Sequence, residues 1–191
     1  MSIDLNLPNK LTIFRIVLAP VFLFLFFAEF IPYNHIFALI VFVVAVITDF
    51  ADGKIARCRN LVTNFGKIAD PIADKILTTI TLLCFMQKNL CSIWVILIII
   101  TREFAVSGIR ITAAAQGSVI PANIYGKVKT VMQMIFSIII LLLLAIQSGI
   151  DFIFPHFEII SEVMMWILAI VTLVSGAIYI KDSAKIIDFS K

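Results

Sequence analysis

The chain has 191 residues, of which 62% are hydrophobic and 14% are charged, and its formal net charge is +3. Soluble domains carry about 25% charged residues, so this composition excludes an ordinary soluble domain and predicts an integral membrane protein. The 17 Phe against 7 Gly favour lipid-facing helices over a β-barrel, whose strands would alternate polar and apolar residues.

The N-terminal segment 1–10 has no positively charged region at its start and no small-residue cleavage pattern before the first apolar run. We therefore expect no cleaved signal peptide, and we expect the first apolar run to remain in the protein. The three cysteines, Cys58, Cys84 and Cys91, are odd in number and lack the spacing of a metal site. We expect neither a disulfide nor a zinc site.

Apolar runs follow one another along the chain, and about 20 such residues suit a bilayer core of about 30 Å. They cover residues 11–28, 36–48, 72–86, 93–113, 128–146 and 159–180. The second and third runs are short unless they include the acidic residues at their ends, so we expect each acidic pair to lie within a helix. Pro20 interrupts the first run, and we expect residues 7–19 to form a separate helix along the membrane interface.

These runs predict an all-α polytopic protein with six transmembrane helices, a short N-terminal interfacial helix and a single membrane domain over residues 1–191. Positive residues mark the cytoplasmic side of a membrane. One set of connections and both termini carry nearly all of them: Lys10, Arg15, Lys54, Arg57, Arg59, Lys67, Lys75, Arg110, Lys127, Lys129, Lys181, Lys185 and Lys191. The opposite loops hold Lys88 with Glu29, Asp151, Glu158 and Glu162. We expect a multi-pass protein of the cell membrane with both termini and the acidic motif facing the cytoplasm.

Two acidic pairs stand at the ends of apolar runs, where an unpaired charge costs several kcal/mol. Asp49 and Asp52 are three residues apart and Asp70 and Asp74 are four apart, so each pair shares one helix face. Carboxylates are the ligands that Mg²⁺ and Mn²⁺ prefer, and two such ions can clamp a pyrophosphate. From the charges alone, an ion-coupled transporter or pairing between helices also remains open.

The whole segment matches the pattern D-x2-D-G-x2-A-R-x8-G-x3-D-x3-D through Asp49, Asp52, Gly53, Ala56, Arg57, Gly66, Asp70 and Asp74. This pattern resembles the signature of the CDP-alcohol phosphatidyltransferase family. The resemblance implies that Asp49, Asp52 and Asp70 bind Mg²⁺ or Mn²⁺, with two ions expected. It implies that Asp74 is the general base and also contacts the second metal. It further implies a homodimer.

A second set of residues is expected to bind the nucleotide donor. Glycine and alanine leave room for close approach of a ligand, and an arginine can pair with phosphate oxygens through two hydrogen bonds. Asn9 and Thr12 would share a face of the first helix, although capping and snorkelling are the plainer interpretation. The same two interpretations apply to Lys67: contact with the nucleotide or its phosphates, or a plain position at the membrane interface. The expected CDP-diacylglycerol-binding residues are Asn9, Thr12, Asp49, Gly53, Ala56, Arg57 and Gly66.

Four cations in the second half of the chain predict an anionic acceptor. Arg102 and Arg110 are eight residues apart, about 12 Å along one side of a helix, and Lys127 and Lys129 follow. We expect Lys129 to be nearer to bulk solvent than Arg110, and Arg102 to be partly neutralised by Glu103. The segments that hold these cations resemble those of bacterial phosphatidylglycerophosphate synthases, a group within the same family. The alternative is that the cations face anionic lipid headgroups.

The resemblance implies an enzyme that transfers the phosphatidyl group from CDP-diacylglycerol to sn-glycerol 3-phosphate, giving phosphatidylglycerophosphate and CMP. The expected partners are these two substrates, membrane lipid and a second copy of the chain, with no nucleic acid. The nearest alternative is the same chemistry on an inositol phosphate or phosphatidylglycerol. A divalent-cation transporter would need a second acidic site on the far side, and a non-catalytic scaffold would not need the space left by Gly53 and Gly66.

Overall fold

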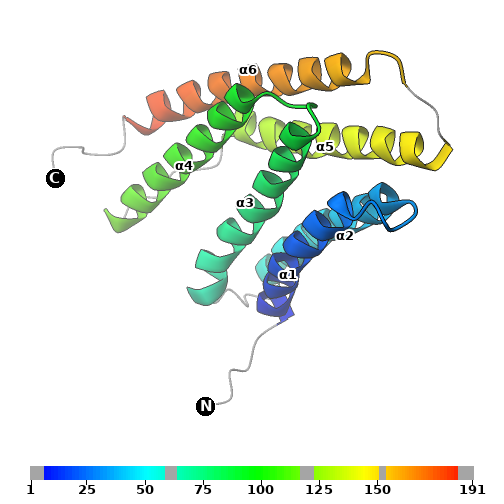
Figure 1. Cartoon of the computed structure of the whole chain (residues 1–191). Coiled ribbons are helices and arrows are strands. Elements are labelled where there is room, and N and C mark those ends of the chain that lie inside the picture. Colours follow the sequence, from blue (N-terminus) through cyan, green and yellow to red (C-terminus); the bar gives the residue numbers. More distant parts are fainter. Residues whose placement is uncertain (1–6, 59–63, 117–122, 151–153, 185–191) are drawn as a thin grey trace. The chain divides into compact units, whose positions relative to one another are not determined.

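The computed structural model describes residues 7–58, 64–116, 123–150 and 154–184 (Figure 1). At 7–10, 51–58, 64–71, 74, 115 and 150, these ranges include residues of which only the backbone is described. Within the described residues every regular element is an α-helix. The six helices are α1 (Leu7–Phe27), α2 (Asn34–Cys58), α3 (Asn64–Gln87), α4 (Ile93–Ala115), α5 (Ile124–Ile150) and α6 (Phe157–Ser183).

Two of these helices are long and apolar enough to cross a membrane, α5 over Ile124–Gly149 and α6 over its full length. Shorter apolar stretches occupy Leu11–Phe27, Asn34–Phe50 and Lys75–Gln87. The predicted all-α class is confirmed for the part of the chain that is described, and its membrane character is supported by these lengths.

The helices extend beyond the apolar runs and include both acidic pairs, as predicted. α2 continues past Thr48 to Cys58, so Asp49 and Asp52 are helical. α3 begins at Asn64, so Asp70 and Asp74 are helical as well. The motif is therefore carried on two helical segments rather than on a loop, and only the short connection between them lies outside the described residues.

The expected division of the first run at Pro20 is wrong. α1 runs without interruption from Leu7 to Phe27 and carries Pro20 inside it, so the short N-terminal helix is not a separate element. Proline removes one backbone hydrogen bond and strains the turn before it. Pro20 lies on the exposed side of α1, whereas its neighbours Ala19 and Phe22 are fully buried. The packing of that buried face holds the helix together across the proline.

The chain divides into two compact units, which are described separately. The first unit contains Met1–Phe85 and Ser137–Pro155, and the second contains Met86–Phe136 and His156–Lys191.

In the first unit α1 and α2 lie side by side (Figure 1). Aromatic rings form their common core, in which the Phe22 and Phe42 ring centroids are 5.9 Å apart. Phe85 of α3 joins this core, with its ring centroid 6.5 Å from that of Phe26. The buried side chain of Asn34 donates a hydrogen bond of 3.2 Å to the carbonyl oxygen of Phe26, near the end of α1. This bond satisfies one of the carbonyl groups that a helix leaves free at its C-terminus.

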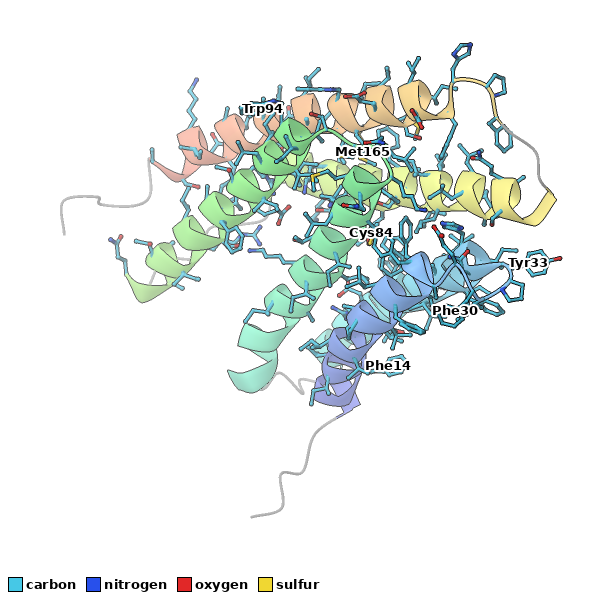
Figure 2. All side chains as sticks on the ribbon, in the orientation of Figure 1. Phe14, Phe30, Tyr33, Cys84, Trp94 and Met165 are labelled. Carbon is cyan, nitrogen blue, oxygen red and sulfur yellow. The ribbon has the colours of Figure 1, made fainter. Side chains whose placement is uncertain are left out.

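The turn between α1 and α2 projects aromatic side chains outward, and Figure 2 shows Phe30 and Tyr33 there. Phe30 is 78% exposed and Tyr33 is 54% exposed. Aromatic rings of this kind are enriched where a membrane meets water. The position of the turn is therefore suited to a membrane interface.

In the second unit α4 packs against α6. The buried face of α6 recurs every three or four residues and includes small and polar side chains: Ser161, Met165, Leu168, Thr172, Ser175, Gly176 and Tyr179. Small residues let two helices approach closely. This approach brings Arg102 of α4 against Gly176 of α6, and Arg110 of α4 against Tyr179 of α6.

Candidate functional site

The acidic motif is described through its backbone and through one side chain. Asp49 and Asp52 stand near the end of α2, and Asp70 and Asp74 stand in the first half of α3. Their spacing places each pair on one helix face. For several predicted site residues only the backbone is described, and their side chains are not: Asn9, Asp52, Gly53, Ala56, Arg57, Gly66, Lys67, Asp70 and Asp74. The grouping of the four carboxylates therefore stays a prediction.

Asp49 is held by an arginine from the neighbouring helix. Arg15 on α1 is 1% exposed, and its Nη1 lies 2.5 Å from Oδ1 of Asp49 on α2. The Asp49 side chain keeps 34% of its surface exposed. Thr12, three residues before Arg15 on the same side of α1, is fully buried. The buried polar face of α1 therefore meets α2 where the acidic motif begins.

The interaction of Arg15 with Asp49 was not predicted, because Arg15 was counted only as a marker of membrane sidedness. One signal was available in the sequence. A cation four residues inside an apolar run needs a partner or a path to water. Asp49, directly after the next apolar run at 36–48, is the first carboxylate that this run offers. A pairing between the two runs follows from that requirement.

The chemistry of these residues fits a hard divalent cation. The donor atoms of the motif are carboxylate oxygens, which Mg²⁺ and Mn²⁺ prefer over the nitrogen and sulfur ligands of softer metals. Asp49 fits this role in particular, because its carboxylate is fixed on one side by Arg15 and is partly open on the other.

The second site gathers cations from α4 and α5 in the second unit. Arg110 is exposed, and its Nε donates a hydrogen bond of 3.2 Å to the hydroxyl of Tyr179 on α6. Its guanidinium carbon lies 5.6 Å from the centre of the Tyr179 ring, a cation–π distance. Lys127 is exposed. Arg110 is thus oriented by α6, while Lys127 is free to reach solvent.

The expectation that Lys129 is near bulk solvent is wrong. Lys129 is 1% exposed, and its Nζ donates to Oε1 of Glu103 at 2.5 Å and to Oε1 of Gln133 at 2.6 Å. Gln133 is one turn further along α5, so the pair forms on one helix face and receives Glu103 from α4. An ammonium group buried to this degree requires such acceptors.

The pairing of Glu103 with Lys129 also changes how far Glu103 neutralises Arg102. The nearest approach of its Nη1 to Glu103 is 3.5 Å, against 2.5 Å for Lys129. Glu103 is thus paired chiefly with Lys129 and neutralises Arg102 only weakly. Within the described residues the buried Nε of Arg102 has no hydrogen-bond partner. The site keeps two arginines on one helix with little compensation from carboxylates.

Sequence reasoning missed Tyr179, Gln133 and the pairing of Glu103. Tyr179 is 3% exposed and lies within an apolar run, where a tyrosine hydroxyl needs a partner. That need was the one available signal. The sequence contained no signal that would assign Glu103 to Lys129 rather than to its neighbour Arg102, because the choice depends on how α5 lies against α4.

Comparison with known proteins identifies the family of the chain. A sequence model of the CDP-alcohol phosphatidyltransferase family matches residues 5–174. Three similar proteins carry the name CDP-diacylglycerol–glycerol-3-phosphate 3-phosphatidyltransferase. The one from Bacillus subtilis is 40% identical over 186 residues, covering 90% of this chain and 91% of its own length. The one from Rickettsia felis is 42% identical over 185 residues, covering 97% and 99%.

The third, from Escherichia coli K12, is 37% identical over 135 residues, covering 68% of this chain and 73% of its own length. The family match spans both the acidic motif and the cations of α4 and α5. The chain therefore belongs to the CDP-alcohol phosphatidyltransferase family.

Proposed function

We propose that the chain transfers the phosphatidyl group from CDP-diacylglycerol to sn-glycerol 3-phosphate, yielding phosphatidylglycerophosphate and CMP. The observation that carries this proposal is 42% identity to a relative named for this reaction, over 97% of the chain. The two weakly compensated arginines on α4 support an acceptor that carries a phosphate.

The donor side of the site is assigned to the acidic motif. Asp49, Asp52 and Asp70 would hold two Mg²⁺ or Mn²⁺ ions, and Asp74 would contact the second of them. When bound, such ions neutralise the pyrophosphate of the donor and stabilise charge on the attacking and leaving oxygens. The remaining donor contacts are assigned to Asn9, Thr12, Gly53, Ala56, Arg57 and Gly66.

The transfer itself needs one proton to be moved. The carboxylate of Asp74 accepts the proton of the acceptor hydroxyl, and the hydroxyl oxygen attacks the phosphorus that bears diacylglycerol. The bond from that phosphorus to the bridging oxygen breaks, and CMP leaves with the electron pair. Arg15 supports this centre indirectly, because it fixes the orientation of Asp49 through their 2.5 Å contact.

The acceptor side is assigned to the second unit. Arg102 and Arg110 would bind the phosphate of glycerol 3-phosphate, with Lys127 at the exposed edge. Lys129 already pairs with Glu103 and Gln133, so its part in acceptor binding is to engage Glu103, which then neutralises Arg102 only weakly. A zwitterionic or neutral acceptor would leave the two arginines without an anion, which disfavours it.

The same proposal includes the arrangement in the cell membrane. All six helices cross the bilayer, both termini and the site face the cytoplasm, and two copies of the chain form a dimer surrounded by membrane lipid. Support comes from the two membrane-length helices and from the many apolar side chains exposed on all six, such as Phe24, Phe37 and Leu97. The orientation is supported by the distribution of Lys and Arg in the sequence.

A reconstituted assay tests the proposed reaction. Purified protein in mixed micelles with CDP-diacylglycerol is given glycerol 3-phosphate, inositol phosphate, phosphatidylglycerol, serine or glycerol, and both CMP and the lipid product are measured. We expect release of CMP and formation of phosphatidylglycerophosphate with glycerol 3-phosphate, well above every other acceptor. Preference for another alcohol would assign the chain to that acceptor instead.

Removal of metal tests the role of the carboxylates. Treatment with EDTA should abolish CMP release, and addition of Mg²⁺ or Mn²⁺ should restore it, because four clustered carboxylates need counter-charge. The same ions should raise the midpoint of thermal unfolding in a concentration-dependent manner. Asp70→Asn should lose this shift, whereas Asp182→Asn, at an exposed carboxylate of α6, should keep it. Full turnover after thorough chelation would refute the assignment.

Substitution of Arg110 tests the acceptor site. Arg110→Ala should raise the KM for glycerol 3-phosphate about 10- to 150-fold, because a charge-assisted hydrogen bond contributes about 1.5–3 kcal/mol. Arg110→Lys should recover part of the loss, since an ammonium lacks the planar fork. The KM for CDP-diacylglycerol should stay unchanged. Lys88→Ala, a control at a lysine before the start of α4, should leave the KM of both substrates unchanged. Equal losses for both substrates would place Arg110 on the donor side.

A further inference from the structure

The side chain of Arg102 lies against two glycines from two other helices of the second unit. A Cβ atom built on Gly176 of α6 would meet Cγ of Arg102 at 2.9 Å. A Cβ atom built on Gly126 of α5 would meet Nη2 of the same side chain at 3.2 Å. Both ends of the Arg102 side chain thus occupy space that exists because these two residues lack a side chain.

The two contacts differ in what they restrict. Cγ is the second carbon of the arginine and is tied closely to the α4 backbone, so a contact of 2.9 Å there cannot be relieved by a movement of the tip. Nη2 is at the far end, and a shift of a few tenths of an ångström relieves a contact of 3.2 Å. Gly176 therefore sets the direction in which the side chain leaves α4, and Gly126 sets the final position of the guanidinium.

Steric direction matters here because ion pairing holds Arg102 only weakly. Glu103 is the neighbouring carboxylate, but its Oε1 accepts a hydrogen bond from Nζ of Lys129, which also donates to Oε1 of Gln133. The contact of Arg102 with Glu103 is long at 3.5 Å, and its Nε has no hydrogen bond within the described residues. The side chain is nevertheless mostly buried, with 11% of its surface exposed. Packing against the glycines is thus the main restraint that these contacts provide.

We propose that Gly176 and Gly126 are positioning residues for the acceptor, which aim the guanidinium of Arg102 at the phosphate of glycerol 3-phosphate. The proposal rests on the proposed function, since it assigns Arg102 to that phosphate. A rigidly directed guanidinium binds a phosphate without first losing side-chain freedom, which lowers the entropic cost of binding. The two glycines thus contribute to acceptor selectivity without touching the substrate.

The competing explanation is that Gly176 serves only to let α4 and α6 approach closely. In that case a methyl group at position 176 would lower stability and would weaken both substrates alike. The chain offers a matched control, because a Cβ atom built on Gly108 of α4 meets nothing within 4 Å. Gly108→Ala makes the same chemical change in the same unit without crowding Arg102.

The experiment compares Gly176→Ala, Gly126→Ala and Gly108→Ala by the KM of each substrate in mixed micelles. Gly176→Ala should raise the KM for glycerol 3-phosphate at least about tenfold and leave the KM for CDP-diacylglycerol unchanged. Gly126→Ala should raise the acceptor KM by a smaller factor, because only the tip of Arg102 must move. Gly108→Ala should change neither value.

A double-mutant cycle shows whether Gly176 acts through Arg102. Arg102→Ala removes Cγ and keeps Cβ, which is 3.9 Å from the added methyl group and thus in ordinary contact. Gly176→Ala made in that background should therefore leave the acceptor KM at the value of Arg102→Ala alone. A further rise in the double variant would overturn the proposal, and so would an unchanged acceptor KM in Gly176→Ala.

The outcomes separate this inference from the proposed function. If the wild-type protein releases no CMP with glycerol 3-phosphate, the function itself is wrong. If the wild type is active and the glycine variants show equal losses for both substrates, only the positioning role is wrong. Should Gly176→Ala fail to fold, Gly126→Ala decides the matter by the same ratio of KM values, and an unchanged ratio there would overturn the proposal.

Discussion

A charge buried within an apolar helix must find a partner, and this requirement governs both the acidic motif and the cationic site of the second unit. Arg15 and Lys129 are each 1% exposed, and each is paired with a carboxylate at 2.5 Å. Removing the carboxylate of such a pair costs about 3–5 kcal/mol, because it leaves the cation buried and uncompensated. The carboxylates of Asp49 and Glu103 are therefore fixed in place by neighbouring helices before any substrate arrives.

The same pairing explains why two arginines are left to bind an anion. Lys129 satisfies Glu103, so the carboxylate that neighbours Arg102 in the sequence does little to neutralise it. Arg110 is oriented by Tyr179, a neutral group that fixes the guanidinium without removing its charge. In the proposed reaction, the phosphate of the acceptor supplies the missing negative charge. The acceptor site is thus cationic because the internal pairs of the second unit are already complete.

Much of the arrangement could be predicted from the sequence because it depends on local pattern. Apolar runs located the helices, and the need to lengthen two of them placed Asp49 and Asp74 inside helices, as the structure confirms. The spacing of the acidic motif was specific enough to indicate the family. These features follow from residues close together in the chain, so they could be predicted without knowledge of packing.

The predictions that failed depend on contacts between helices. Pro20 was expected to end a helix, but the packing of Ala19 and Phe22 holds α1 together across it. Lys129 was expected near solvent, but α4 brings Glu103 over it. The room that Gly176 gives to Arg102 likewise joins positions 74 residues apart along the chain, and nothing in either local segment indicates it.

One double-mutant cycle tests most directly whether buried ion pairs hold these charged side chains in place. Glu103→Leu and Lys129→Met each replace one member of the pair with an apolar side chain of similar size, and unfolding is followed in detergent micelles. Glu103→Leu should lower the unfolding free energy by about 3–5 kcal/mol, because it leaves the buried ammonium of Lys129 without its carboxylate. Lys129→Met should lower it by less, and the double variant should recover most of the loss of Glu103→Leu. Losses that simply add in the double variant would contradict the account.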